Sequence, residues 1–206
     1  PPRSTLLPNP ALVRSLRISD YDRDDDGYIA RYRIDPRNYL AADPDGGKLD
    51  NVNTYETCGA RVALLITPDD TLTITPSFIY QYAKVDSPFT YDKIPATLQD
   101  PYQVRDVSKA NVQKSTISNL AIHKQFDAFE LMSSTSYFTR HIVVKDDSSK
   151  ATHFFFNLPS VYPTPTFGLY KNNETTQETR PTSKFDRPFP APVGAFHHDV
   201  DAPLVP

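Results

Sequence analysis

Alternation of apolar and polar side chains between residues 60 and 80 is the feature that most restricts how this chain can fold. Residues 60–66 carry an apolar side chain at every second position, with Arg61 on the other side. From residue 71 the alternation returns, and it sets Leu72, Ile74, Phe78 and Tyr80 against Thr71, Thr73, Thr75 and Ser77. Successive side chains of a β-strand point to opposite faces. Both segments are therefore predicted to be strands with one apolar and one polar face.

The segment Thr67-Pro68-Asp69-Asp70 joins these two strands and has the composition of a tight turn. Proline pre-sets φ at a turn position, and aspartate accepts hydrogen bonds from the nearby backbone. We therefore predict a β-hairpin over residues 54–84. The remaining predicted pairs are a hairpin over 114–144 turning at 124–127, a hairpin over 174–199 turning near Asp186-Arg187-Pro188, and one strand pair within 11–34.

Long polar segments separate the predicted hairpins. Residues 85–113 and 145–173 are rich in Pro, Asp, Lys and Tyr, whereas the turns at 67–70 and 124–127 are short. Unstructured loops of this length are uncommon inside compact soluble domains. Outer-membrane β-barrels combine short turns at one end with long loops at the other. The spacing therefore favours antiparallel up-and-down hairpins of that kind.

Composition excludes several classes of protein. The 206 residues include 22 Lys and Arg against 25 Asp and Glu, so the chain lacks the overall basic charge of a general nucleic-acid binder. No apolar run approaches the roughly 20 residues with which a helix crosses a bilayer. The single cysteine excludes an internal disulfide. With 20 prolines and no helical apolar period, the chain is predicted to be all-β, and its 12 Tyr and 12 Phe argue against disorder.

The acidic segment 22–29 matches the beginning of an EF-hand calcium loop. It has aspartate at positions 1, 3 and 5 of the motif, Gly27 at position 6 and Ile29 at position 8. Position 12, where the motif requires glutamate, is occupied by Arg33, whose charge repels calcium. No amphipathic helix flanks the segment. We therefore interpret it as an acidic surface turn between strands.

The histidines and the cysteine show no spacing typical of a catalytic or metal site. His197 and His198 are adjacent and would point to opposite faces of a strand, and Cys58 has no recognisable partner base. The other histidines are His123, His141 and His153. Phosphate-binding, metalloprotease and hydrolase motifs are absent. We therefore expect no enzyme activity, no catalytic residue, no cofactor site and no metal site.

Aromatic residues form two groups that allow two interpretations. One group is Tyr80, Tyr82, Phe89, Tyr91 and Tyr102, and the other is His153-Phe154-Phe155-Phe156. Each group suits a surface on which a ligand stacks. Each also suits an aromatic girdle at a membrane interface, where the ring lies in the apolar layer and the polar tip in water.

Several stretches resemble the barrel of TonB-dependent outer-membrane receptors. Residues 51–65, which contain Thr-Tyr-Glu-Thr-Cys-Gly-Ala-Arg-Val-Ala-Leu-Leu, are similar to the "TYGARAAL" arm of that family, and 67–77 are similar to its "PxDxLTITPS" arm. Residues 132–140 are similar to "TSSTSYFDR", 177–180 to "QETR" and 193–199 to "VVGAFYHD". Asp25-Asp26-Gly27-Tyr28-Ile29 fits an earlier strand and loop of the same barrels. The similarity covers most of residues 15–200, in the same order.

The resemblance implies that residues 1–206 are part of a transmembrane β-barrel domain in the cell outer membrane. Such a receptor binds a scarce small molecule, often an iron–siderophore complex, and imports it with energy from the TonB system. The implied partners are outer-membrane lipid, the ferric chelate, and the TonB system through a missing N-terminal part; nucleic acid is not among them. Residues such as Val62, Leu72 and Phe78, with Leu64 and Ile74, would face lipid, and Arg61, Thr73 and Thr75 would face the lumen.

The chain also departs from the pattern of that family. The plug domain and the TonB box are absent, and the end of the chain, Ala-Pro-Leu-Val-Pro, is not an aromatic barrel strand. About six or seven strands are predicted, whereas such transporters have about 22. We therefore expect an internal fragment of a receptor barrel. The alternative is a soluble all-β binding module that recognises carbohydrate or protein through its aromatic loops.

Overall fold

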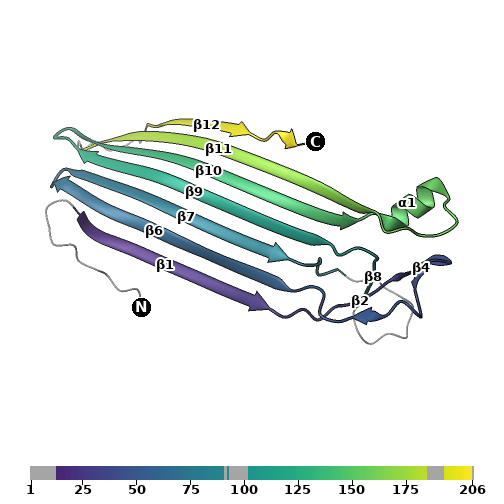
Figure 1. Cartoon of the computed structure of the whole chain (residues 1–206). Helices are drawn as coiled ribbons and strands as arrows, with labels where there is room; N and C mark the ends of the chain where they lie inside the picture. Colours follow the sequence, from purple (N-terminus) through teal and green to yellow (C-terminus); the bar gives the residue numbers. More distant parts are fainter. Residues whose placement is uncertain (1–12, 91, 93–101, 185–192, 206) are drawn as a thin grey trace.

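The computed structural model of the chain describes residues 13–90, 92, 102–184 and 193–205 (Figure 1). Seven long strands form most of it: β1 (Val13–Asp25), β6 (Tyr55–Asp69), β7 (Leu72–Val85), β9 (Ala110–Gln125), β10 (Phe129–Asp147), β11 (Pro165–Ser183) and β12 (Ala195–Asp201). The short elements are β2 (Ala30–Tyr32), β3 (Ile34–Asp35), β4 (Asn38–Ala42), β5 (Lys48–Leu49), β8 (Tyr102–Val104), α1 (Ser149–Phe156) and β13 (Leu204–Val205).

The seven long strands form one antiparallel sheet in the order β1-β6-β7-β9-β10-β11-β12, with β13 also paired to β11. The predicted all-β class is therefore confirmed. The hairpins predicted over 54–84 and 114–144 correspond to β6–β7 and β9–β10. Strands β11 and β12 pair within the third predicted hairpin, and its expected turn at 186–188 lies outside the described residues. The strands do not close into a barrel, because β1 and β12 end the order.

The strand pair predicted within residues 11–34 is wrong. Strand β1 pairs with β6 along its length, from Val13 opposite Ile66 to Asp25 opposite Tyr55. Residues 30–35 instead form β2 and β3, which belong to two small separate sheets. The partner of β1 is thus distant in sequence, and the alternation of side chains along one strand does not predict such a pairing.

The register divides the large sheet into the two faces expected from the alternation. Val62 lies opposite Phe78, and Arg61 lies opposite Ile79 on the reverse side. The apolar face carries Leu16, Ile18, Val62, Leu64, Ile66, Leu72, Ile74, Phe78, Leu120 and Ile122. The other face is mostly polar and carries Arg17, Arg61, Thr73, Thr75, Ser77, Gln81, Gln113, Ser115, Asn119, Ser134 and Arg140, together with the apolar Leu65, Ile79, Ile117 and Phe138. Around the middle of β10 and β11 the apolar face becomes polar, since Leu120 is followed across the sheet by Thr135 and Gln177.

The connections at the two ends of the large sheet differ in length. At the turn end, residues 70–71 join β6 to β7, and residues 126–128 join β9 to β10. At the other end, the loop end, the three connectors are residues 26–54, 86–109 and 148–164. The long loops predicted at 85–113 and 145–173 are therefore shorter than expected, because β9, β10 and β11 extend into them. The third connector contains α1, and the first, at 26–54, was not predicted as a connector.

The three connectors fold together at the loop end into what we call the connector cluster (Figure 1). Its two small sheets are β5-β2-β8 and β3-β4. The buried apolar core of the described chain lies here, in Ile29, Ala30, Ile34, Tyr102, Val104, Val107 and Val161. Among the described residues, no helix is both long and apolar enough to cross a membrane.

Candidate ligand-binding site

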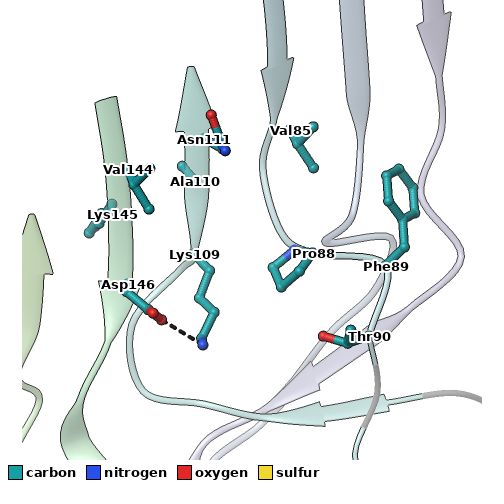
Figure 2. A pocket seen from close by; sticks show the side chains of 10 residues that line it. All are labelled: Val85, Pro88, Phe89, Thr90, Lys109, Ala110, Asn111, Val144, Lys145 and Asp146. Atoms are coloured by element: carbon teal, nitrogen blue, oxygen red, sulfur yellow. Dashed lines mark ion pairs between the residues drawn. The ribbon is translucent and has the colours of Figure 1, made fainter. Parts of the chain in front are cut away.

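A pocket of about 490 Å³ opens where the large sheet meets the connector cluster (Figure 2). Its lining comes from the ends of β7, β9 and β10 and from the second connector: Val85, Pro88, Phe89, Thr90, Lys109, Ala110, Asn111, Val144, Lys145 and Asp146. The mixture of apolar side chains with a few charged groups is the usual composition of a small-molecule site.

The floor of the pocket belongs to the polar face of the large sheet. Asn111 of β9 lies opposite Val85 of β7 on one side and opposite Val144 of β10 on the other. Directly paired residues of antiparallel strands share a face. The pocket therefore lies on the side that also carries Arg61 and Arg140.

Charged groups line one side of the pocket. Lys109 Nζ lies 2.5 Å from Asp146 Oδ1, and Figure 2 shows these two side chains pointing toward each other. Lys145 Nζ donates a hydrogen bond to Ser108 Oγ at 3.4 Å. The aromatic ring of Phe89 is half exposed on the connector side. The pocket can therefore offer a ligand both an apolar surface and charged hydrogen-bonding groups.

A buried glutamine holds the pocket wall at residues 87–90. Gln103, on β8, is 1% exposed. Its Oε1 accepts a hydrogen bond from Ser87 Oγ at 2.7 Å, and its Nε2 donates to the carbonyls of Pro88 and Thr90 at 2.8 and 2.5 Å. A buried amide with all these partners stabilises one backbone path for the segment that presents Phe89. Nothing in the local sequence around Gln103 indicates this role.

An ion-paired carboxylate ties the second connector to the third. Asp92 accepts the Val104 N–H at 2.8 Å, and its carboxylate lies 3.1 Å from Arg105 Nη1 and 3.5 Å from Lys150 Nζ. Partial burial acts to raise the pKa of Asp92, but the Val104 hydrogen bond and the two cations outweigh it, so this pKa lies below its ordinary value. Burial also lowers the pKa of Lys150. The folded cluster therefore favours the ionised form of Asp92, whereas burial acts against the charged form of Lys150.

A second carboxylate, Asp147 at the end of β10, binds two connectors at once. Its Oδ2 accepts the N–H groups of Asp106 and Val107 at 2.8 and 3.1 Å. Its Oδ1 accepts the N–H and hydroxyl of Ser149, the first residue of α1. Charge-assisted hydrogen bonds of this kind are about twice as strong as neutral ones. Asp147 thereby anchors the connector cluster to the large sheet.

The aromatic residues singled out from the sequence do not form one surface. Tyr102 is 4% exposed in the core of the connector cluster, and Phe89 lines the pocket. Tyr80 and Tyr82 belong to the apolar face, and Tyr91 lies outside the described residues. In the second group, His153 packs against Tyr39 with ring centroids 4.8 Å apart, while Phe154, Phe155 and Phe156 of α1 are exposed.

The segment that resembles an EF-hand does not form a loop around an ion. Residues 22–25 continue β1, so the interpretation as a surface turn is wrong for this half of the segment. The bend at Gly27 is held by Asn53, whose Oδ1 accepts the N–H groups of Tyr28 and Ile29 at 2.8 and 2.7 Å. A Cβ at Gly27 would lie 2.7 Å from that Oδ1, which explains the glycine.

The described histidine, cysteine and acidic side chains include no group of three or more that could hold a metal ion. His123 pairs with Glu130, and His198 pairs with Glu174, each at 3.3 Å. Cys58 is a half-buried free thiol.

Searches against protein-family models, curated proteins and solved structures found no match to this chain.

Proposed function

We propose that the chain forms part of the wall of an outer-membrane β-barrel receptor, of the TonB-dependent kind, that binds and imports a scarce small molecule such as a ferric chelate. One observation carries this proposal. The large sheet is a single layer with an apolar and a polar face, and away from the connector cluster no described helix or strand packs on either face. A bilayer on one side and a watery lumen on the other would match those two faces.

Strand length supports a spanning role. Six strands of the large sheet have 13 to 19 residues each, namely β1, β6, β7, β9, β10 and β11. A tilted strand needs about 9–11 residues to cross the hydrocarbon layer. The extra length at the loop end carries charges on the otherwise apolar face, among them Asp22, Asp24 and Glu56. These residues would lie beyond the lipid.

The position of the pocket supports a binding role for the loop end. In the proposed receptor, the turn end of the large sheet would face the periplasm and the connector cluster would face the outside of the cell. The pocket of about 490 Å³ then lies at the outer mouth of the lumen, because its floor is the polar face. A ligand caught there would already be on the side of the wall through which transport proceeds.

The edges of the sheet require additional strands in this proposal. β1 and β12 end the sheet order, and each has a long-strand neighbour on one side only. Hydrocarbon cannot solvate the unpaired N–H and C=O groups of an edge strand. The proposed barrel would therefore be completed by strands beyond this sheet.

Two cysteine variants on neighbouring positions test the proposal. Val62 and Ala63 lie on opposite faces of β6. In a Cys58→Ser background, Val62→Cys and Ala63→Cys are labelled with a water-soluble maleimide after the full chain is reconstituted in phosphatidylcholine vesicles. The expected result is slow labelling at position 62, fast labelling at position 63, and quenching by a lipid-phase quencher only at position 62. Equal labelling at both positions contradicts the proposal.

The connector cluster favours a second candidate, the soluble all-β binding module. This part of the molecule has its own buried apolar core and resembles an ordinary soluble fold. That candidate expects a monodisperse monomer in buffer without detergent. Size-exclusion chromatography with light scattering distinguishes it from the receptor wall, which is expected to aggregate until detergent covers the apolar face.

A further inference from the structure

We propose that a second, basic pocket in the connector cluster binds an anionic group, a carboxylate or phosphate, of a small ligand. The pocket has a volume of about 250 Å³, and its lining includes Arg31, Arg33, Lys48, Arg105, Asp106 and the turn at residues 46–47. Four cationic side chains thus line it against a single carboxylate.

That carboxylate is already engaged by the fold. The side chain of Asp106 is only 5% exposed, and its Oδ1 accepts the backbone N–H of Ile34 at 3.0 Å. Arg33 Nε lies 3.9 Å from the same oxygen, a distance at the limit of an ion pair. Asp106 therefore holds the first and second connectors together, and by itself it balances at most one of the four cations that line the pocket.

The four cationic side chains differ in whether they already form ion pairs or hydrogen bonds with other groups. Arg105 is bound to Asp92 and to the Val104 carbonyl, and Lys48 Nζ lies 2.6 Å from Asp50. Arg31 has no ion-pair partner within the described part of the chain, and Arg33 keeps 65% of its side chain exposed. A guanidinium presents a planar fork of donors that fits carboxylate and phosphate groups. Arg31 and Arg33 are therefore the groups that would bind the anion directly.

The glycine turn shapes the other side of this basic pocket. A Cβ on Gly46 would lie 2.9 Å from the Cβ atoms of Arg33 and Asp43, so only glycine allows the turn to approach so closely. Gly47 has φ +75°, a left-handed conformation that glycine adopts without strain. The turn therefore stands close beside Arg33 and encloses the pocket.

This inference names a ligand class for the proposed receptor and rests on that proposed function only for its biological role. Binding itself is measured by isothermal calorimetry on the full chain with sodium phosphate and, separately, with citrate. Ionic strength is held constant with sodium chloride, because surface attraction of anions is screened by salt. We expect saturable binding of at least one of the two probes.

Arg31→Gln is expected to weaken that binding about tenfold, which corresponds to the loss of about 1.4 kcal/mol. Arg33→Gln, at an exposed position, is expected to weaken it in the same direction and keeps the test open if the first variant fails to fold. The matched control is Arg23→Gln, which removes a cation paired with Asp25 on β1 outside the pocket and leaves affinity unchanged.

Two results would overturn the inference: no saturable binding of either probe, or an equal loss of affinity in the Arg23→Gln control. The maleimide test at positions 62 and 63 does not depend on anions. A failure of the anion site and a failure of the receptor proposal are therefore separable.

Discussion

The large sheet and the connector cluster are parts of one chain, yet only the cluster has a buried apolar core. Ile34 and Val104 in the cluster are 2% and 1% exposed. In the large sheet Ile18 is 55% exposed and Phe78 is 44% exposed, although both belong to the apolar face. Large exposed apolar patches on a protein mark a surface that another phase or partner covers. The cluster is therefore stabilised by its own packing, whereas the apolar side chains of the described sheet stay largely exposed.

The largest effect is expected from Ile34→Ala in the connector cluster. Removing a fully buried side chain costs about 2–5 kcal/mol, because transfer free energy is lost and a cavity remains. Hydrogen–deuterium exchange should show faster exchange in β2, β4 and β8 while the central strands β7 and β9 stay protected. Leu40→Ala, at a position 69% exposed, is the control and should change exchange little. Loss of protection in both regions would mean that they unfold as one unit.

A pair of lysine substitutions on β7 compares the two faces of the sheet. Phe78→Lys places a charge on the apolar face, and Ser77→Lys places one on the polar face. In phosphatidylcholine vesicles, a lysine at the bilayer midplane costs about 2–4 kcal/mol, whereas a lumen position tolerates it. Urea unfolding of the reconstituted chain measures the difference. If both variants keep the stability of the parent chain in vesicles, the apolar face does not contact lipid.

Asp147→Ala tests the junction between the two regions. The substitution removes a carboxylate that accepts the N–H groups of Asp106, Val107 and Ser149. Hydrogen bonds to a charged group contribute about 1.5–3 kcal/mol, so the cluster should detach at lower urea concentration than in the parent chain. Asp127→Ala, in the exposed turn between β9 and β10, is the control. A simultaneous shift of the sheet and the cluster would show that Asp147 does not act at the junction alone.

The smallest effect is expected from acid, through Asp92. The folded chain holds the pKa of Asp92 below its value in the unfolded chain, so the ionised carboxylate stabilises the cluster at pH values above about 4. This contribution is lost as the pH falls through the folded pKa. Tyrosine fluorescence, to which Tyr32 and Tyr102 of the cluster contribute along with the other tyrosines of the chain, should follow the change. In the Asp92→Asn variant, the change in fluorescence with falling pH should be smaller than in the parent chain. If that change stays the same, carboxylates other than Asp92 cause it.

The alternation of side chains was sufficient to predict the central part of the sheet. It located the β6–β7 and β9–β10 hairpins and the division of Val62 and Arg61 between two faces. Turn chemistry at Pro68 and Asp69 placed the first turn within two residues of its position. The pairing of β1 with β6 was missed, because 29 residues separate them and the alternation carries no information on partners distant in sequence.

The candidate site was much less accessible to sequence reasoning. Gln103, Asn53 and Asp147 organise the loop end through hydrogen bonds to backbone groups, and such roles have no fixed spacing. The expectation that the aromatic residues lie on a surface was wrong for Tyr102, which is buried in the core of the connector cluster, whereas Phe154 is exposed. Asp147 lies one residue before the N-cap of α1, which is Ser148, so a helix-capping pattern would not have identified it.

By itself, the sequence determined the local conformation of the long strands and the chemistry of their two faces, because each property repeats every two residues along a single strand. Only the tertiary structure decided which strands pair over long distances, and that three separate connectors fold together around Ile34 and Val104. The physical reason is that hydrogen bonds between strands and the burial of a shared core depend on residues that meet only after the chain has folded. The pocket above Asn111 and the basic pocket beside Arg31 both arise from that assembly.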